Sequence, residues 1–122
     1  MAFTNKENVR GVVVHAEVSL IPIGSSDPTT DGKVSTGMSR EIAVAFDAIS
    51  KVQGLKVILT PMGTQIESNN LSNIFRAVEL AHQAVKDIGI KRIISTIRID
   101  ERIDASHTLE DKVDSVKKKL PK

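Results

Sequence analysis

The chain has no cysteine, tyrosine or tryptophan, and only three of its 122 residues are phenylalanine. Without cysteine there can be no disulfide, thiolate nucleophile or zinc–thiolate site, which fits a reducing cytosol. With so few aromatic residues the core must be aliphatic, and a sheet that stacks the bases of single-stranded nucleic acid is disfavoured. We therefore expect no disulfide framework and no nucleic-acid partner.

Long hydrophobic runs are also missing. Residues 1–10 lack the apolar stretch of a signal peptide, and no segment approaches the roughly 18 apolar residues of a membrane span. The net charge is only +2, and the basic excess gathers in Lys117, Lys118, Lys119 and Lys122, which is typical of a solvated end. These features predict a cytoplasmic protein that does not bind a membrane.

The length and composition are those of one globular domain, with 40% apolar and 26% charged residues. We expect residues 1–10 to be a flexible leader and residues 11–122 to form a single domain. Residues 24–38 are rich in turn formers, and so long a connection inside a compact domain is either functional or mobile.

Apolar periodicity predicts the order of the elements. Alternation marks strands at 11–23, 55–59, 65–68 and 91–102, and Pro22 is expected to end the first of them. Between and after these strands, apolar residues spaced by three or four positions predict three amphipathic helices.

The ends of these helices carry recognisable signals. Ser39 is a candidate N-cap for the first helix, and Gly54 is expected to close it. Gly89 ends the second helix, whereas Thr108 and Asp111 have the spacing of a capping box for the third.

The predicted order βαββαβ plus a C-terminal helix is that of an α+β, ferredoxin-like sandwich with an antiparallel sheet. Both main helices would cover one face of the sheet and leave the other uncovered. That face mixes apolar and charged residues, which suits a subunit interface, so we expect a homo-oligomer. Its predicted members are Val13, Glu17, Ile21, Ile58, Thr60, Glu67, Ile94, Arg98 and Asp100.

The segment between the two central strands is the first candidate for a site. Pro61 fixes its own φ, and Gly63 tolerates a positive φ, so the segment predicts a turn or bulge. Thr60, Thr64 and Glu67 surround this turn with hydroxyls and a carboxylate. The simpler alternative is an exposed hairpin tip.

Other residue types give weaker signals. His15, His82 and His107 lie on different predicted elements without the spacing of a metal pair, so we expect structural or surface histidines and no metal site. There is no nucleophile–base signature and no phosphate-binding glycine loop.

Four separated motifs resemble a known family. They are Glu17-Val-Ser-Leu-Ile-Pro-Ile-Gly24, Ser39-x-x-Ile42-Ala43, Thr60-Pro-Met-Gly-Thr-x-Ile-Glu67, and Arg92 with Ile99-Asp100-x-Arg102-x-Asp104 and Lys112-Val113. In this order, over roughly residues 11–120, the pattern resembles the small thiamine-binding proteins, a group related to YkoF-type thiamine and hydroxymethylpyrimidine carriers. The resemblance implies a ferredoxin-like fold, a homotetramer built as a dimer of dimers, and non-catalytic binding of thiamine or its pyrimidine half.

The chemistry of thiamine indicates which side chains could bind it. A carboxylate can pair with the cationic thiazolium or accept from the pyrimidine amino group, hydroxyls can bind the ring edge, and Met62 and Ile21 can form an apolar wall. The expected ligand-binding residues are Glu17, Ser19, Ile21, Thr60, Met62, Gly63, Thr64, Glu67 and Asp100. For the three carboxylates the alternative is a salt bridge to Arg98, Arg102 or Lys56.

The leading hypothesis is therefore a carrier, buffer or sensor of thiamine or hydroxymethylpyrimidine that needs no cofactor. Two alternatives remain open at this point. One is an enzyme that uses the carboxylates Glu17, Glu67 and Asp100 as an acid–base group on a heterocycle. The other is a purely structural assembly module.

Overall fold

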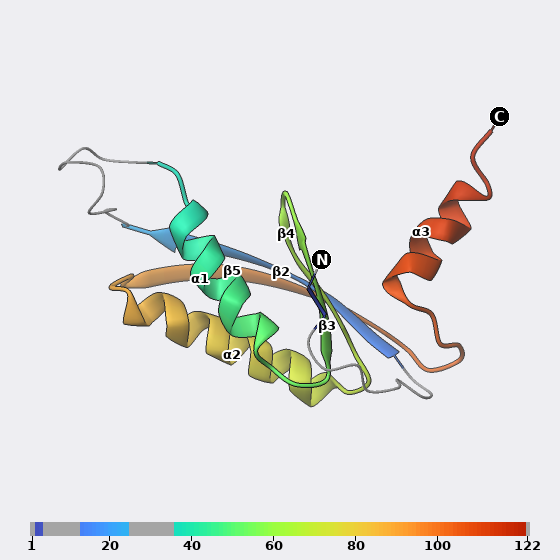
Figure 1. Ribbon diagram of the computed structural model, residues 1–122, viewed down its shortest axis with the longest axis horizontal. Coiled ribbons are helices and arrows are strands. Elements are labelled where there is room, and N and C mark those ends of the chain that lie inside the picture. The colour runs from blue at the N-terminus through green and yellow to red at the C-terminus, as the bar shows by residue number, and fades with distance from the viewer. Residues whose placement is uncertain (1, 4–12, 25–35, 122) are drawn as a thin grey trace.

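A computed structural model describes residues 2–3, 13–24 and 36–121 of the chain. From β2 onward its strands and helices follow one another in the order that the apolar periodicity predicts (Figure 1). In chain order they are β1 (Ala2–Phe3), β2 (Val13–Ile23), α1 (Ser39–Ser50), β3 (Leu55–Thr60), β4 (Gly63–Ser68), α2 (Leu71–Asp87), β5 (Arg92–Arg102) and α3 (Leu109–Lys117).

The strands form one antiparallel sheet in the order β1-β3-β4-β2-β5. The succession β2-α1-β3-β4-α2-β5 confirms the α+β, ferredoxin-like fold class. Ala2–Phe3 add a short strand at the β3 edge, within the range expected to be a leader. Residues 4–12 of that leader and residues 25–35 of the long connection lie outside the described residues.

Helices α1 and α2 cover one face of the sheet (Figure 1). Each presents an apolar stripe to residues that alternate along the strands, and the resulting core is aliphatic, as the composition predicts. Its largest fully buried apolar side chains are Val14, Ile49, Leu55, Val57, Ile66, Ile74 and Val85.

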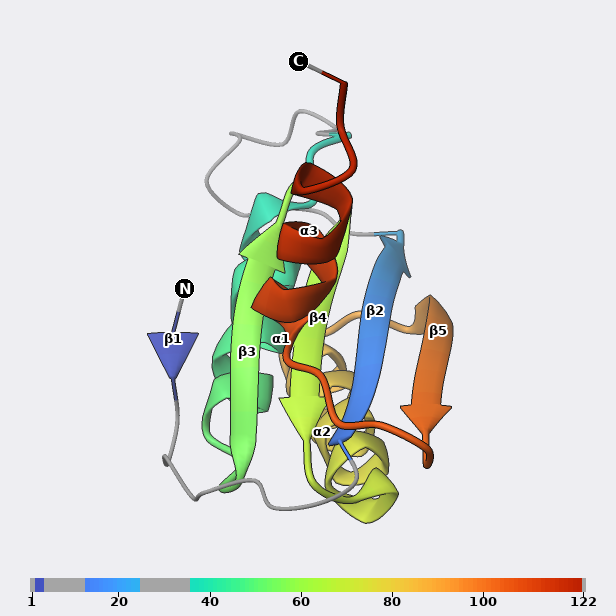
Figure 2. The same ribbon diagram turned by 90° about the vertical axis from the view of Figure 1, so that its right-hand side faces the viewer.

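The opposite face of the sheet is not bare, contrary to the prediction. Helix α3 lies over it, in front of β3 and β4 in Figure 2, while α1 and α2 lie behind the sheet. None of the α3 residues is buried, and Val113, Val116 and Leu120 remain more than half exposed. The apolar pattern of α3 predicts a helix correctly, but it does not reveal that polar contacts hold this helix on the sheet.

Pro22 does not end β2, which continues to Ile23. The last pair that β2 forms with β4 is Val18 with Thr64, whereas Pro22 pairs with Ile93 on β5. A proline is tolerated there because the strand has a partner on one side only.

Two predicted helix ends are also corrected. Helix α1 begins at Ser39 itself, with Met38 as N-cap and no side-chain cap bond, and it ends at Ser50. Gly54 therefore lies beyond the helix, in the turn before β3, where its φ of 81° favours glycine. Gly89 follows the C-cap of α2 with a φ of 97°, and the capping box of Thr108 and Asp111 is present, as predicted.

Candidate functional site

The turn between β3 and β4 is tighter than the sequence suggests. Thr60 pairs with Gly63, so only Pro61 and Met62 connect the strands. The Thr60 hydroxyl donates a 2.7 Å hydrogen bond to the Gly63 carbonyl oxygen, which closes the turn. Thr60 therefore has a structural task in addition to any contact with a ligand.

Gly63 is required for space and not for a positive φ, which corrects the prediction. It is the first residue of β4, and its φ is outside the left-handed region. A Cβ at this position would lie 3.0 Å from the carbonyl oxygen of Val18 and 3.3 Å from Cγ of Glu17. The glycine therefore permits the end of β4 to approach β2 closely.

This close approach forms one wall of a pocket of about 250 Å³, which we call the hairpin pocket. Helix α1 forms the other wall through Ile42, Ala45 and Ile49. Six of the nine predicted ligand-binding residues line it, namely Ser19, Ile21, Thr60, Met62, Gly63 and Thr64. The structure thus brings these six residues together around one cavity.

The hairpin pocket is mainly apolar, with a few hydroxyls. Thr64 is only 6% exposed, and within the described part of the chain neither its hydroxyl nor that of Ser19 has a hydrogen-bond partner. Met62, at the tip of the turn, is 83% exposed. No acidic side chain lines the pocket among the described residues. An apolar cavity with a few polar groups is the usual form of a small-molecule site.

The three predicted carboxylates do not join this pocket. They lie on the opposite face of the sheet, where β2 pairs with β4 and β5. Glu17 Oε2 accepts a 3.2 Å hydrogen bond from the Gln65 side chain, and its other oxygen lies 3.8 Å from Arg98 Nη2. Glu17 therefore matches the alternative to ligand binding, a salt bridge to Arg98.

Glu67 is the most firmly held of the three. Its side chain is 7% exposed, and Oε1 lies 2.9 Å from Nε2 of the equally buried His15. The same oxygen accepts a 2.8 Å hydrogen bond from the backbone N–H of Leu109, the first residue of α3. Lys56 Nζ lies 3.9 Å from the second oxygen. Glu67 thus ties α3 to the sheet.

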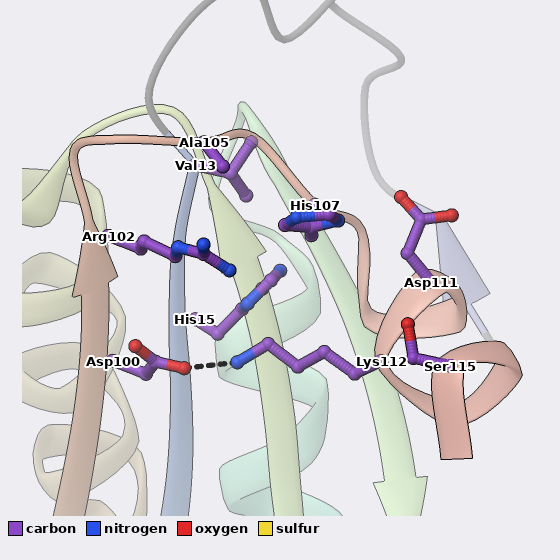
Figure 3. Close-up of a pocket in the computed structure, with 9 residues that line it drawn as sticks. All are labelled: Val13, His15, Asp100, Arg102, Ala105, His107, Asp111, Lys112 and Ser115. Atoms are coloured by element: carbon purple, nitrogen blue, oxygen red, sulfur yellow. Dashed lines mark hydrogen bonds and ion pairs between the residues drawn. The ribbon is translucent and has the colours of Figure 1, made fainter. Parts of the chain in front are cut away.

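Asp100 makes a further contact with α3. Its carboxylate accepts a hydrogen bond from Lys112 (Figure 3), so its partner is a helix lysine and neither of the neighbouring arginines that were expected. Lys56 likewise donates to Glu110. The three contacts of Glu67, Asp100 and Lys56 with the first turns of α3 explain why a helix without buried residues lies on the sheet.

The lysine partners change the acidity of two of these groups. The hydrogen bond from Lys112, and then its charge, lower the pKa of Asp100 below its ordinary 3.8. The hydrogen bond from Lys56 lowers the pKa of Glu110 below its ordinary 4.5. Because both pKa values fall on folding, the contacts stabilise above the ordinary values and are lost as the pH drops through the lowered ones.

We expect a Lys112→Met variant to raise the pKa of Asp100 toward 3.8, because both the donor and the charge are removed. Carboxyl ¹³C NMR during an acid titration measures this shift. Lys51→Met removes a solvent-exposed i,i+4 partner of Asp47 on α1 and serves as the control. An Asp100 titration that is the same in both variants would contradict the contact.

Some residues at these sites are missed by the sequence reasoning. His15 is a structural histidine, as expected, but its partner Glu67 and its place opposite Asp100 on β5 were not predicted. His82 is structural, as expected, because its Nε2 lies 2.8 Å from the Ser95 hydroxyl. Only the strand register reveals the position of His15, and no sequence spacing encodes that register.

Two classes of site find no support in the described residues. Among them no group of three or more His, Asp or Glu side chains is placed to hold a metal ion. No described helix is long and apolar enough to cross a membrane. The chain is thus, as far as it is described, a small ferredoxin-like domain with one apolar pocket beside its central hairpin.

Comparison with known proteins identifies the family. The family model described as "Thiamine-binding protein" matches residues 16–117, and the chain belongs to this family. It is 36% identical over 108 residues to a UPF0045 protein of Methanothermobacter thermautotrophicus, covering 88% of this chain and 100% of the relative. It is 38% identical over 105 residues to the UPF0045 protein YqgV of Bacillus subtilis, covering 86% and 95%.

Solved structures agree with the fold. MJ1052 from Methanocaldococcus jannaschii superposes with a TM-score of 0.72 at 32% identity, covering 86% of this chain and 96% of its own. TM0486 from Thermotoga maritima, which carries a provisional assignment to thiamine biosynthesis or salvage, has a TM-score of 0.66 at 22% identity, covering 85% and 98%. At that identity the second likeness concerns the fold alone.

Proposed function

We propose that this chain is a non-catalytic binding protein for thiamine or its hydroxymethylpyrimidine half, and that the ligand occupies the hairpin pocket. Membership of the thiamine-binding family supports the ligand class. The observation that carries the location is that six residues chosen for their chemistry line one cavity between α1 and the hairpin. The carboxylates Glu17, Glu67 and Asp100 are then structural and do not contact the ligand.

The pocket suits an aminopyrimidine. This ring presents an amino donor beside ring-nitrogen acceptors, and the hydroxyl of Thr64 can both donate and accept. Ile42 and Ile49 offer apolar surface to the faces of the ring, and Met62 can add a polarizable sulfur at the entrance. Because Thr64 is almost fully buried, a bond from its hydroxyl to the ligand would form away from competing water.

The hairpin pocket offers fewer favourable contacts to the cationic thiazolium than to the pyrimidine. No acidic side chain lines the hairpin pocket among the described residues, and its volume of about 250 Å³ is small. Ligand pockets usually span roughly 300–1,000 Å³. We therefore propose that the pyrimidine half provides most of the affinity, with the thiazolium of thiamine directed toward the pocket mouth.

This proposal predicts that hydroxymethylpyrimidine binds at least as tightly as thiamine in calorimetry. Thr64→Val, which keeps the shape and removes the hydroxyl, should weaken binding about tenfold, since one buried hydrogen bond is lost. Thr96→Val changes an exposed threonine on the opposite face of β5 and should leave binding unchanged. The proposal would be refuted if neither ligand gave a heat of binding at high micromolar protein concentration.

We also propose that the chain works as a cytoplasmic homo-oligomer, a tetramer built as a dimer of dimers. Exposed apolar side chains support this, because Val113 and Val116 on α3, Leu120 shortly after it, and Ile21 and Ile94 on the sheet are each 44% exposed or more. Native mass spectrometry of freshly purified protein reports the subunit number and any retained small molecule in one measurement. A monomer without an organic ligand would count against both parts of the proposal.

The catalytic alternative is less well supported. The acid–base use of Glu67 requires a carboxylate that can exchange protons with a substrate, yet its Oε1 is shared by His15 and the Leu109 N–H. Asp100 is held by Lys112. Chromatography of a candidate pyrimidine after incubation with the protein separates turnover from binding.

A further inference from the structure

A second cavity, of about 300 Å³, lies between the sheet and α3, and we call it the α3 cavity (Figure 3). His15 from β2 and Arg102 from β5 form its floor, whereas His107 and Lys112 approach from the segment leading into α3 and from α3 itself. It is separate from the hairpin pocket, which shares none of its lining residues.

Nitrogen-bearing side chains converge on this cavity. In Figure 3 the guanidinium of Arg102 and the rings of His15 and His107 point toward one another, with the Lys112 ammonium below them. The carboxylate of Asp111 turns away from them and accepts from the Thr108 N–H. Three of these four groups therefore face one another, and His15 also contacts the buried carboxylate of Glu67.

The side chains around the α3 cavity offer more hydrogen-bond donors than acceptors. Arg102 uses Nε and Nη2 on Asp104, at 2.7 and 3.1 Å, which leaves three of its five N–H donors. Lys112 has three donors and gives one to Asp100. The carboxylates of Asp100 and Asp104 are thus already engaged, and the cavity keeps more donors than acceptors.

The fixed charges of the lining side chains are balanced, because Asp100 and Asp111 offset Arg102 and Lys112. Two further carboxylates are already engaged by lining residues, Glu67 by His15 and Asp104 by Arg102. An arginine fork beside a lysine is the usual arrangement for a phosphate group, because phosphate oxygens accept several charge-assisted hydrogen bonds at once.

We propose that the α3 cavity is a second ligand site, which binds the phosphate group of a small phosphate monoester or free phosphate through Arg102, Lys112, His15 and His107. The volume exceeds that of a lone phosphate and leaves space for a small organic group beside Val13 and Ala105. Because Lys112 belongs to α3, a bound phosphate would add a bridge between this helix and the sheet. The proposal does not depend on the ligand of the hairpin pocket.

The test is a titration of the full-length, ¹⁵N-labelled chain with inorganic phosphate at fixed pH and ionic strength, observed at the histidine side chains by NMR. The side-chain resonances of His15 and His107 should shift with phosphate concentration and reach a plateau. The resonances of His82, which bonds to Ser95, should not shift. Arg102→Gln should weaken phosphate binding about tenfold, because several charge-assisted donors are lost. Methyl phosphate, compared with inorganic phosphate, distinguishes a monoester ligand from the free ion.

Arg98→Gln is the matched control, since Arg98 lies on the same face of β5 as Arg102, four residues earlier, and does not line the α3 cavity. Its apparent Kd for phosphate should equal that of the unchanged chain. The proposal is overturned if His15 and His107 do not shift, if acetate binds as tightly as phosphate, or if Arg102→Gln and Arg98→Gln behave alike. Hydroxymethylpyrimidine binding measured on Arg102→Gln separates this outcome from a failure of the hairpin pocket.

Discussion

Replacing Glu67 by alanine should destabilise the protein by about 3 kcal/mol and lower its melting temperature by about 10 °C. The change strips a hydrogen-bond partner from two groups at once, the buried His15 Nε2 and the Leu109 backbone N–H. Each buried group left without its partner costs about 1–3 kcal/mol. Differential scanning calorimetry measures the loss.

Glu17→Ala is the matched control on the neighbouring strand. Glu17 is one-third exposed, and its contacts with Gln65 and Arg98 are long, so its removal should cost less than about 1 kcal/mol. Glu67→Ala should also leave hydroxymethylpyrimidine binding unchanged, since Glu67 does not line the hairpin pocket. Intact thermal stability with lost ligand binding would instead make Glu67 a ligand-binding residue.

Filling the hairpin pocket should abolish binding. Ala45 faces the pocket from α1 and is 5% exposed, so Ala45→Leu places a branched side chain in the space proposed for the pyrimidine. We expect hydroxymethylpyrimidine affinity to fall by more than about 100-fold, because the ring and the leucine cannot occupy the same volume. Calorimetry with hydroxymethylpyrimidine measures the effect.

Ala43→Leu makes the same change two residues earlier on α1, at an exposed position outside the hairpin pocket. It should retain full affinity. The melting temperature of each variant shows whether the helix still packs, and Thr64→Val supplies a second variant of the pocket that does not add volume. Undiminished binding by a folded Ala45→Leu protein would place the ligand elsewhere.

The fold is predictable from the sequence because its signals are local. Apolar spacing separates strands from helices, and Gly89 and the Thr108–Asp111 box mark two helix ends correctly. The errors at Pro22 and Gly54 have a common cause. Whether a proline ends a strand, or a glycine ends a helix, depends on the neighbours that the chain meets there.

The candidate site is predicted in part. The hydroxyls and the turn around Pro61 and Met62 are contiguous in sequence, so their proximity follows from the hairpin alone. The carboxylates Glu17, Glu67 and Asp100 are expected to join them because a carboxylate can pair with the thiazolium or accept from the pyrimidine amino group. The pleat, however, turns Glu67 to the face opposite Thr64, where it meets His15.

The sequence by itself determined the class of this protein, since composition and periodicity leave one aliphatic core with two helices on an antiparallel sheet. Only the tertiary structure decided which residues share a cavity. Antiparallel pairing brings Glu67 and Asp100, which are more than 30 residues apart in the chain, together with α3. Close packing of Gly63 on β2 opens the hairpin pocket toward α1. Register and packing are non-local, so residues distant in the chain acquire their partners only when the sheet is formed.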